Sequence, residues 1–145
     1  MIKLVLFFAF VYFIMIQAIH VDIPVDLEKK RDYKAPEHII KILKDACYDC
    51  HSYETKWPWY SYMAPVSWLI RYDVDHALKW LNYNRWDEYK DKTKEKLLRA
   101  TIRLIDSGGM PTPIYLFMHD EAQLTKEQKE QVKIWAKNSL INKDY

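Results

Sequence analysis

Cys47-Tyr48-Asp49-Cys50-His51 is the stretch from which the architecture of this chain is best predicted. Two thiols three positions apart, followed at once by an imidazole, form the attachment pattern for c-type haem. On a starting helix, this spacing lets both sulfurs bond to one edge of the porphyrin while the imidazole is carried beneath the iron. The pattern therefore predicts one covalently attached haem c, held by Cys47 and Cys50, with His51 as the proximal iron ligand.

The two cysteines, the only ones in the chain, have three other interpretations: a redox dithiol, a single disulfide and half of a zinc site. A thioredoxin-like dithiol is expected near a βαβ pattern, and the sequence lacks the strand-rich segments that would form one. A zinc site would need two more ligands. The histidines beyond His51 are scattered along the chain: His20, His38, His76 and His119. Haem attachment is the stronger hypothesis.

The N-terminus is typical of an exported or membrane-anchored chain. Lys3 supplies a positive start, and an unbroken apolar run follows from Leu4 to Ile16. Both cleavage near Ala18 and retention as an anchor over residues 4–19 are open, and the bulky side chains before Ala18 favour the anchor. With Lys3 inside the cell, the remaining chain is expected on the periplasmic side of the inner membrane, where c-type haem is attached.

The sequence predicts three consecutive parts: a signal or membrane anchor over residues 1–19, a polar tether over residues 20–35, and one domain over residues 36–145. A chain of 145 residues is too short for two domains of ordinary size. Acids and bases nearly balance at a formal charge of +2, which argues against nucleic acid as a partner. The eleven Tyr and six Trp could form walls around a flat macrocycle or simply fill a small core.

Within the domain, apolar side chains recur at helical spacing and predict four helices. These begin at Pro36, at Val66, at Trp86 and at Thr125. The third is expected to stop at the glycine pair 108–109, and the fourth has an N-cap pattern in which Gln128 follows Thr125 by three positions. No segment is typical of a strand, so the predicted fold class is all-α.

An aromatic loop is predicted between the first two helices. In Trp57-Pro58-Trp59-Tyr60 the proline forbids a regular helix, and the aromatic residues do not alternate with polar ones as in a strand. We expect this loop to pack over the haem. A backbone carbonyl of Pro58 or Pro65 is a candidate to hold the second ring nitrogen of His51, the contact that raises the basicity of such a ligand.

The ligand on the other face of the iron decides whether a haem protein transfers electrons or binds small molecules. Met110 is the first candidate, because it lies between a glycine pair and a proline in a short, stiff loop that suits a thioether ligand. Met118 and His119 are adjacent alternatives, and His119 would give a bis-histidine iron of lower potential. The predicted metal ligands are therefore His51 and Met110, with Met118 and His119 left open.

Further segments accompany the haem motif along nearly the whole chain: Tyr33-Lys34-Ala35-Pro36, Trp57-Pro58-Trp59-Tyr60-Ser61, Ala64-Pro65-Val66-Ser67-Trp68-Leu69, Leu81-Asn82-Tyr83, Trp86, Met110-Pro111, His119, Glu121-Ala122 and Leu124-Thr125. With them, the chain resembles the bacterial haem-binding domain family, which consists of small cytochrome c-like proteins with one haem. The resemblance implies a cytochrome c-like helical fold around one covalent haem c, with His51 as proximal ligand. Met110 with its following proline also looks like the distal pair of ordinary cytochromes c.

Different classes of function are compatible with such a site. The leading hypothesis is an electron carrier without enzymatic activity, tethered at the membrane, whose iron exchanges one electron with a redox protein partner. The alternative is a haem enzyme or sensor whose distal face opens for peroxide or a gas. A peroxidase would want an acid or base above that face, and neither His119 nor His76 has a sequence context that argues for this role. A docking subunit of a respiratory complex is a third possibility.

Overall fold

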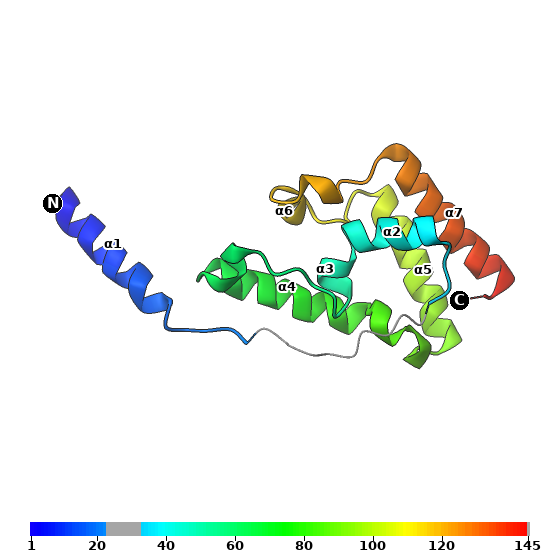
Figure 1. The fold of residues 1–145 in the computed structure, drawn as a ribbon, viewed down its shortest axis with the longest axis horizontal. Helices are drawn as coiled ribbons and strands as arrows, with labels where there is room; N and C mark the ends of the chain where they lie inside the picture. Colours follow the sequence, from blue (N-terminus) through cyan, green and yellow to red (C-terminus); the bar gives the residue numbers. More distant parts are fainter. Residues whose placement is uncertain (23–32, 145) are drawn as a thin grey trace.

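The computed structural model describes residues 1–22 and 33–144, and within these residues the chain is helical and contains no strand. The α-helices of this part are α1 (Ile2–Ile16), α2 (Glu37–Ala46), α3 (Tyr48–His51), α4 (Val66–Trp80), α5 (Asp91–Asp106), α6 (Pro113–Leu116) and α7 (Lys126–Asn142). Short 3₁₀-helices lie between them: η1 (Trp59–Tyr62), η2 (Tyr83–Glu88) and η3 (Asp120–Ala122). The all-α fold class predicted from the sequence is therefore confirmed for the described residues (Figure 1).

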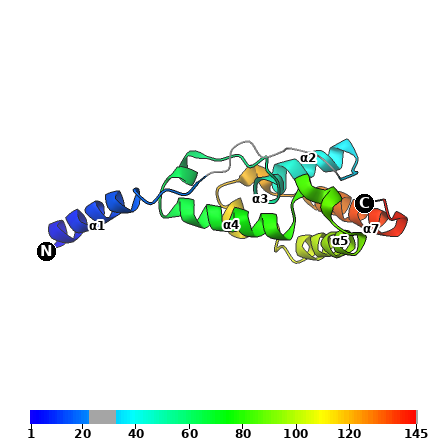
Figure 2. The ribbon, with the colours of Figure 1, turned by 90° about the horizontal axis from the view of Figure 1, so that it is seen from below.

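The apolar core forms where α2, α5 and α7 pack together (Figures 1 and 2). Each of these helices has apolar side chains at helical spacing that are at most 5% exposed: Ile39, Leu43, Leu98, Ile105, Val132 and Ala136. Full burial of an Ile, Leu or Val side chain contributes about 1.5–3 kcal/mol relative to an exposed one. This part of the domain therefore holds itself together through its own side chains.

A cluster of aromatic side chains connects the core to the cysteine motif. Tyr48, inside the motif, stacks on Tyr83 with ring centroids 5.3 Å apart, and Tyr33 lies 5.0 Å from Tyr83. The hydroxyls of Tyr33 and Tyr48 are hydrogen-bonded to each other. Buried hydroxyls need such partners, and the pair fixes Tyr48 and with it the start of α3.

The predicted tether of residues 20–35 lies only partly within the structure. Its central residues, 23–32, lie outside the described residues. Tyr33, at its end, is a core residue with 6% exposure, and the carbonyl of Lys34 accepts a hydrogen bond from Trp135 Nε1 at 3.3 Å. Tyr33 and Lys34, which the sequence assigns to the tether, therefore contact the packed domain.

The sequence predicts that the third domain helix begins at Trp86, and this start is wrong. The chain forms η2 at this point, and α5 begins only at Asp91. Arg85 leaves helical geometry, with φ −122° and ψ 24°, and the Trp86 indole is buried in the core with 2% exposure. Tertiary packing of the indole therefore outweighs the local tendency to continue a helix.

The predicted start of the last helix is confirmed. Thr125 is the N-cap of α7, and its side chain accepts a hydrogen bond from the backbone N–H of Gln128. The Gln128 side chain in turn accepts from the N–H of Thr125 at 2.9 Å, which completes a capping box. At the first domain helix, Pro36 is the N-cap of α2 and Glu37 is its first helical residue.

The apolar N-terminal segment forms α1, a helix of 15 residues of which none is buried (Figure 1). It covers most of the predicted anchor at residues 4–19. Among the described residues, no helix has both the length and the apolar character needed to cross a membrane.

Candidate functional site

The cysteine motif occupies the turn between α2 and α3. Cys47 ends α2, with its N–H donating to the carbonyl of Leu43 at 2.8 Å. The N–H of His51 donates to the carbonyl of Cys47 at 2.9 Å, which closes the single turn of α3. The two thiols and the imidazole therefore lie on one turn of helix, as the spacing of the motif predicts.

Both thiols are free and half-buried. Burial, with a smaller contribution from Cys50, raises the pKa of Cys47 to about 12. Burial, with the charges of Asp49 and Asp73, raises the pKa of Cys50 to about 11. Reactive dithiols have lowered pKa values, so these protonated thiols do not fit a redox dithiol. In the described part of the chain, no group of three or more His, Cys, Asp or Glu residues could hold a metal ion such as zinc.

The imidazole of His51 is held in one orientation by a backbone carbonyl. Its Nδ1 lies 3.0 Å from the oxygen of Leu81, and since a carbonyl only accepts, Nδ1 carries the proton. Burial lowers the pKa of His51, against a smaller opposite effect of the Leu81 and Ala77 carbonyls. A neutral ring leaves the Nε2 lone pair available. Within the described residues no hydrogen bond engages Nε2, which is the state that a metal-ligating histidine requires.

The expected partner of His51 was wrong. The sequence suggests the carbonyl of Pro58 or Pro65, whereas the structure gives that of Leu81. Leu81 follows the last residue of α4 and adopts an extended conformation, with φ −144° and ψ 122°. Its carbonyl is therefore released from the helix ladder and turns toward α3.

A network of hydrogen bonds fixes the backbone that follows the cysteine motif. The N–H of Tyr53 donates to Asn84 Oδ1 at 2.7 Å, and the N–H of Asn84 donates to Asn82 Oδ1 at 2.9 Å. The N–H of Asn82 donates to the hydroxyl of Tyr89 at 2.9 Å. Asn82 is 2% exposed and Asn84 5%. No role in the site was predicted for these asparagines, although two amides at the end of a predicted helix are a signal that the sequence offers.

Asp49, between the two cysteines, connects the motif to α6. Its Oδ2 accepts a hydrogen bond from the hydroxyl of Tyr115 at 2.7 Å, and its Oδ1 accepts from the N–H of Lys56 at 3.0 Å. Burial and this carboxylate raise the pKa of Tyr115 well above its ordinary value. The bond brings the segment that follows Met110 against α3. It was not anticipated from the sequence.

Met110 lies in the tight loop between α5 and α6. Gly108 adopts a positive φ of 69°, the region that glycine enters without steric cost. The N–H groups of Gly109 and Met110 both donate to the carbonyl of Leu104, at 2.9 and 3.3 Å. The loop therefore folds back on the end of α5 and holds a half-buried Met110. Its role as an iron ligand stays a prediction.

Both ring nitrogens of His119, the alternative ligand, are hydrogen-bonded to other side chains. Its Nδ1 lies 2.9 Å from Glu121 Oε1, so Nδ1 carries the proton, and Nε2 accepts from the hydroxyl of Tyr60 at 2.7 Å. The ring also stacks on Tyr115, with centroids 4.3 Å apart. Binding iron would cost His119 the Tyr60 bond. Its neighbour Met118 is 55% exposed.

Apolar side chains on the helices that adjoin the motif are left exposed. Helix α4 buries only Ser67 and Val74, and α6 buries none of its residues. On and beside these two helices, large apolar side chains are exposed: Leu69, Tyr72, Trp80, Ile114 and Phe117. Leu81 and Tyr115 join the end of α4 and α6, respectively, to α3. Two thiols, a neutral imidazole and exposed apolar surface fit a haem, whose macrocycle is flat and largely apolar.

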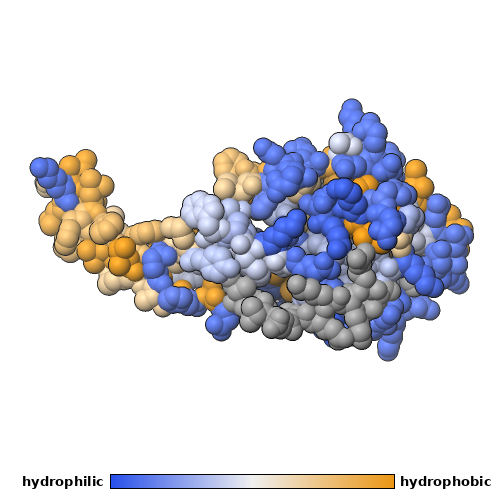
Figure 3. All heavy atoms as spheres, in the orientation of Figure 1, coloured by the Kyte–Doolittle hydropathy of each residue, from blue (hydrophilic) through white to orange (hydrophobic). Residues whose placement is uncertain are grey.

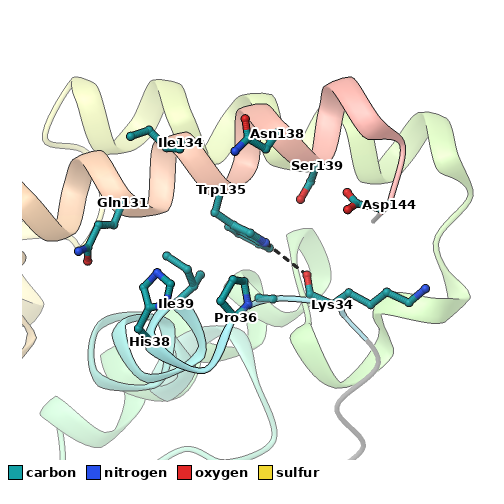
Figure 4. A pocket seen from close by; sticks show the side chains of 11 residues that line it. Lys34, Pro36, His38, Ile39, Gln131, Ile134, Trp135, Asn138, Ser139 and Asp144 are labelled. Atoms are coloured by element: carbon teal, nitrogen blue, oxygen red, sulfur yellow. Dashed lines mark hydrogen bonds between the residues drawn. The ribbon is translucent and has the colours of Figure 1, made fainter.

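A cavity of about 570 Å³ lies elsewhere, between the start of α2 and the C-terminal half of α7 (Figure 4). Pro36, Ile39 and Trp135 line it, together with polar side chains such as Asn138. None of the predicted site residues contributes to this cavity.

Comparison with known proteins supports haem binding. A family model described as haem-binding domain matches residues 6–138, which cover the motif, the aromatic loop and the Met110 loop. No curated protein and no solved structure matches the chain.

Proposed function

The chain belongs to the haem-binding domain family, and from this premise we propose that it is an electron carrier with one covalently attached haem c in a cytochrome c-like domain. Haem, when bound, supplies an iron that changes by one electron between its ferric and ferrous forms. Cys47 and Cys50 would hold the porphyrin by thioether bonds, and His51 would hold the iron through Nε2. We infer no catalytic residue.

The observation that carries this proposal is the state of His51. Its Nδ1–H donates to the Leu81 carbonyl at 3.0 Å, and its Nε2 is left available one residue after the second of two free thiols. This bond orients the ring and raises its basicity as a ligand. A ring fixed in this way does not need to rearrange when the iron gains or loses an electron.

We further propose Met110 as the distal ligand. Its loop is held by two hydrogen bonds to Leu104, and the segment that follows is tied to the motif by the Tyr115–Asp49 bond. His119 is engaged on both ring nitrogens, and Met118 is exposed. A thioether ligand would place the reduction potential high, as suits a carrier that accepts electrons from a redox protein.

The proposed location is the periplasmic side of the inner membrane. The support is the sequence of residues 1–19, in which Lys3 precedes an apolar run of the kind that directs export. Retention of residues 4–19 would anchor the domain there. The intact mass of the mature protein tests this, because cleavage near Ala18 would remove these residues.

Spectroscopy of protein matured in a host competent for c-type haem attachment tests the haem proposal. After denaturation and acid-acetone extraction, the pigment should stay on the polypeptide, and alkaline pyridine should give a c-type haemochrome spectrum. A colourless chain, or haem that extraction removes, would contradict covalent attachment.

The ferric near-infrared spectrum tests the distal ligand. Native protein and the matched control Met118→Ala should show the sulfur-to-iron band, and Met110→Ala should lose it. A bis-histidine spectrum would keep electron transfer and remove Met110 as ligand. A high-spin spectrum that shifts with carbon monoxide or cyanide would favour the enzyme or sensor alternative.

A further inference from the structure

The end of the apolar helix α1 is hydrogen-bonded to the loop that precedes α4. The side-chain amide of Gln17 accepts from the N–H of Ala64 at 2.9 Å and donates to the carbonyl of Ala64 at 3.0 Å. Trp68 Nε1 donates to the carbonyl of Ile19 at 3.1 Å. One amide thus pairs with both backbone groups of a residue that is 4% exposed. These bonds, here called the Gln17 clamp, attach α1 at a defined place on the domain.

Exposed aromatic side chains surround this attachment point. In η1 and directly after it, Trp59 is 72% exposed, Tyr62 65% and Met63 38%. Met63 immediately precedes the clamped Ala64. We call these three residues the aromatic corner. The corner is linked to the end of α1 through the bonds between Gln17 and Ala64.

We propose that α1 and the aromatic corner together form a docking surface for a lipid bilayer, which fixes the orientation of the domain on the membrane. This deepens the proposed membrane location and rests on it. The apolar run from Leu4 to Ile16 is unbroken, so every side of helix α1 is apolar over these residues, and the helix buries none of them. Figure 3 shows the side of this helix that faces the viewer. A protein groove covers one stripe of a helix, whereas acyl chains cover every side, so lipid is the partner that fits.

The composition of the corner fits the boundary of a bilayer rather than its centre. Trp and Tyr are enriched at the level of the headgroups, where the ring is covered and the polar atom stays hydrated. The corner lies where α1 ends, so helix and corner would meet the bilayer together. Gln17 would then lie at the same boundary, with its amide satisfied by Ala64.

Tyr60 connects the docking surface to the proposed haem site through a chain of side-chain contacts. It lies in η1 between Trp59 and Tyr62, and its hydroxyl donates to His119 Nε2 at 2.7 Å. His119 stacks on Tyr115, which is bonded to Asp49 inside the motif. The haem-bearing turn therefore has a defined position relative to the docking surface, and a partner would meet the same face of the domain each time.

Labelling from the lipid phase tests the proposal on the full-length, haem-loaded protein. The protein is placed at one chain per nanodisc of phosphatidylcholine and phosphatidylglycerol that contains a phosphatidylcholine with a photoactivatable diazirine near its headgroup. After illumination, mass spectrometry compares the tryptic peptide 57–71, which contains the corner, with peptides 134–137 and 138–143 of α7, which contain the exposed Ile134 and Ile141 and lie away from the proposed haem site. We expect at least about tenfold more label on 57–71, because only the corner meets the headgroups.

A variant that lacks the Gln17 clamp provides a second test in the same labelling experiment. Gln17→Ala should keep α1 labelled and reduce the label on peptide 57–71 by at least about threefold, because the helix no longer holds the corner at the surface. Gln123→Ala removes an exposed amide elsewhere and should change nothing.

Two results would overturn the proposal: equal labelling of the three peptides, or labelling of 57–71 only when a nanodisc carries two chains, which would make the corner a self-association surface. Pyridine haemochrome measured on the same samples reports the proposed function separately. Lack of haem would contradict that function and leave the labelling pattern to decide the docking surface.

Discussion

At the scale of single residues, the site combines two thiols of raised pKa with one imidazole whose orientation is fixed by a hydrogen bond. Cys47 and Cys50 are protonated at neutral pH because burial raises the pKa of each. His51 is kept neutral by burial and is oriented by the Leu81 carbonyl. The folded, haem-free chain should therefore resist adventitious oxidation of its thiols, and the Nε2 lone pair of His51 is available to the proposed iron.

The first prediction concerns thiol alkylation in the haem-free chain. A thiol with a pKa of about 11, as for Cys50, is a thiolate far less often near neutral pH than an ordinary cysteine. Iodoacetamide at pH 7.5 should therefore alkylate the folded chain at least about 100-fold more slowly than the same chain in urea. The rate should rise about tenfold per pH unit and level off only above a pH of about 11. Equal rates in folded and unfolded chains would contradict the burial of these thiols.

The second prediction separates a structural role of His119 from ligation. His119→Ala removes the bonds to Tyr60 and Glu121, so the free energy of unfolding should fall by about 1 kcal/mol. The near-infrared sulfur-to-iron band should persist, because Met110 is the proposed ligand. The matched control is His76→Ala, since His76 is exposed and its ring bonds only to the Tyr72 carbonyl. Loss of the low-spin spectrum in His119→Ala alone would make His119 the ligand.

Which of these residues the sequence can reveal depends on how local their chemistry is. The two thiols and the imidazole fall within five consecutive positions, so their function is visible in the spacing. The Leu81 carbonyl lies 30 positions from His51, and Tyr115 lies 66 from Asp49. Such contacts depend on where the helices pack, and no periodicity records them.

At the scale of helices, the bond between Tyr115 and Asp49 joins the two sides of the site. Helix α6 has one turn and no fully buried residue, and only Tyr115 and Leu116 among its four residues pack partly against the core. The Tyr115 hydroxyl fastens it to α3, and the stacked His119 extends the contact toward η1. The position of the Met110 loop therefore depends on this bond.

The third prediction tests that dependence. Tyr115→Phe keeps the ring and loses the hydroxyl, which should lower the free energy of unfolding by about 1.5–3 kcal/mol, the range for a hydrogen bond to a charged group. In the haem-loaded protein the sulfur-to-iron band should weaken or broaden as the Met110 loop becomes less fixed. Tyr72→Phe is the control, because that side chain is 59% exposed. An unchanged stability and band would show that α6 is held by other contacts.

The helices themselves were largely predictable. The apolar period locates α2, α4 and α7, and the Thr125 and Gln128 side chains mark the start of α7 correctly. The predicted start of α5 was wrong because Trp86 lies in η2, where its side chain is buried in the core, and does not belong to the apolar face of α5. Helix α6 was missed because its single turn is too short to show a period.

At the scale of the whole molecule, the domain has two parts that differ in how much apolar surface they bury. Helices α5 and α7 share buried apolar residues, among them Leu98, Ile105, Val132 and Ala136. Helix α4 buries only Ser67 and Val74, and α6 buries nothing. One part of the molecule thus supplies its own core, and the other leaves apolar surface for a cofactor to cover.

The fourth prediction follows from this division. In the haem-free variant Cys47→Ala/Cys50→Ala, amide hydrogens in α4 and α6 should exchange much faster than those in α5 and α7, because local opening costs least where little apolar surface is buried. Covalent haem should slow exchange in α4 and α6 by at least about 100-fold, since a group that binds only the folded state stabilises it. Exchange in α5 and α7 should change less. Hydrogen exchange read by mass spectrometry on both proteins measures this directly. A uniform change in all four helices would mean that haem stabilises one cooperative unit, and that the core of α5 and α7 does not stand on its own.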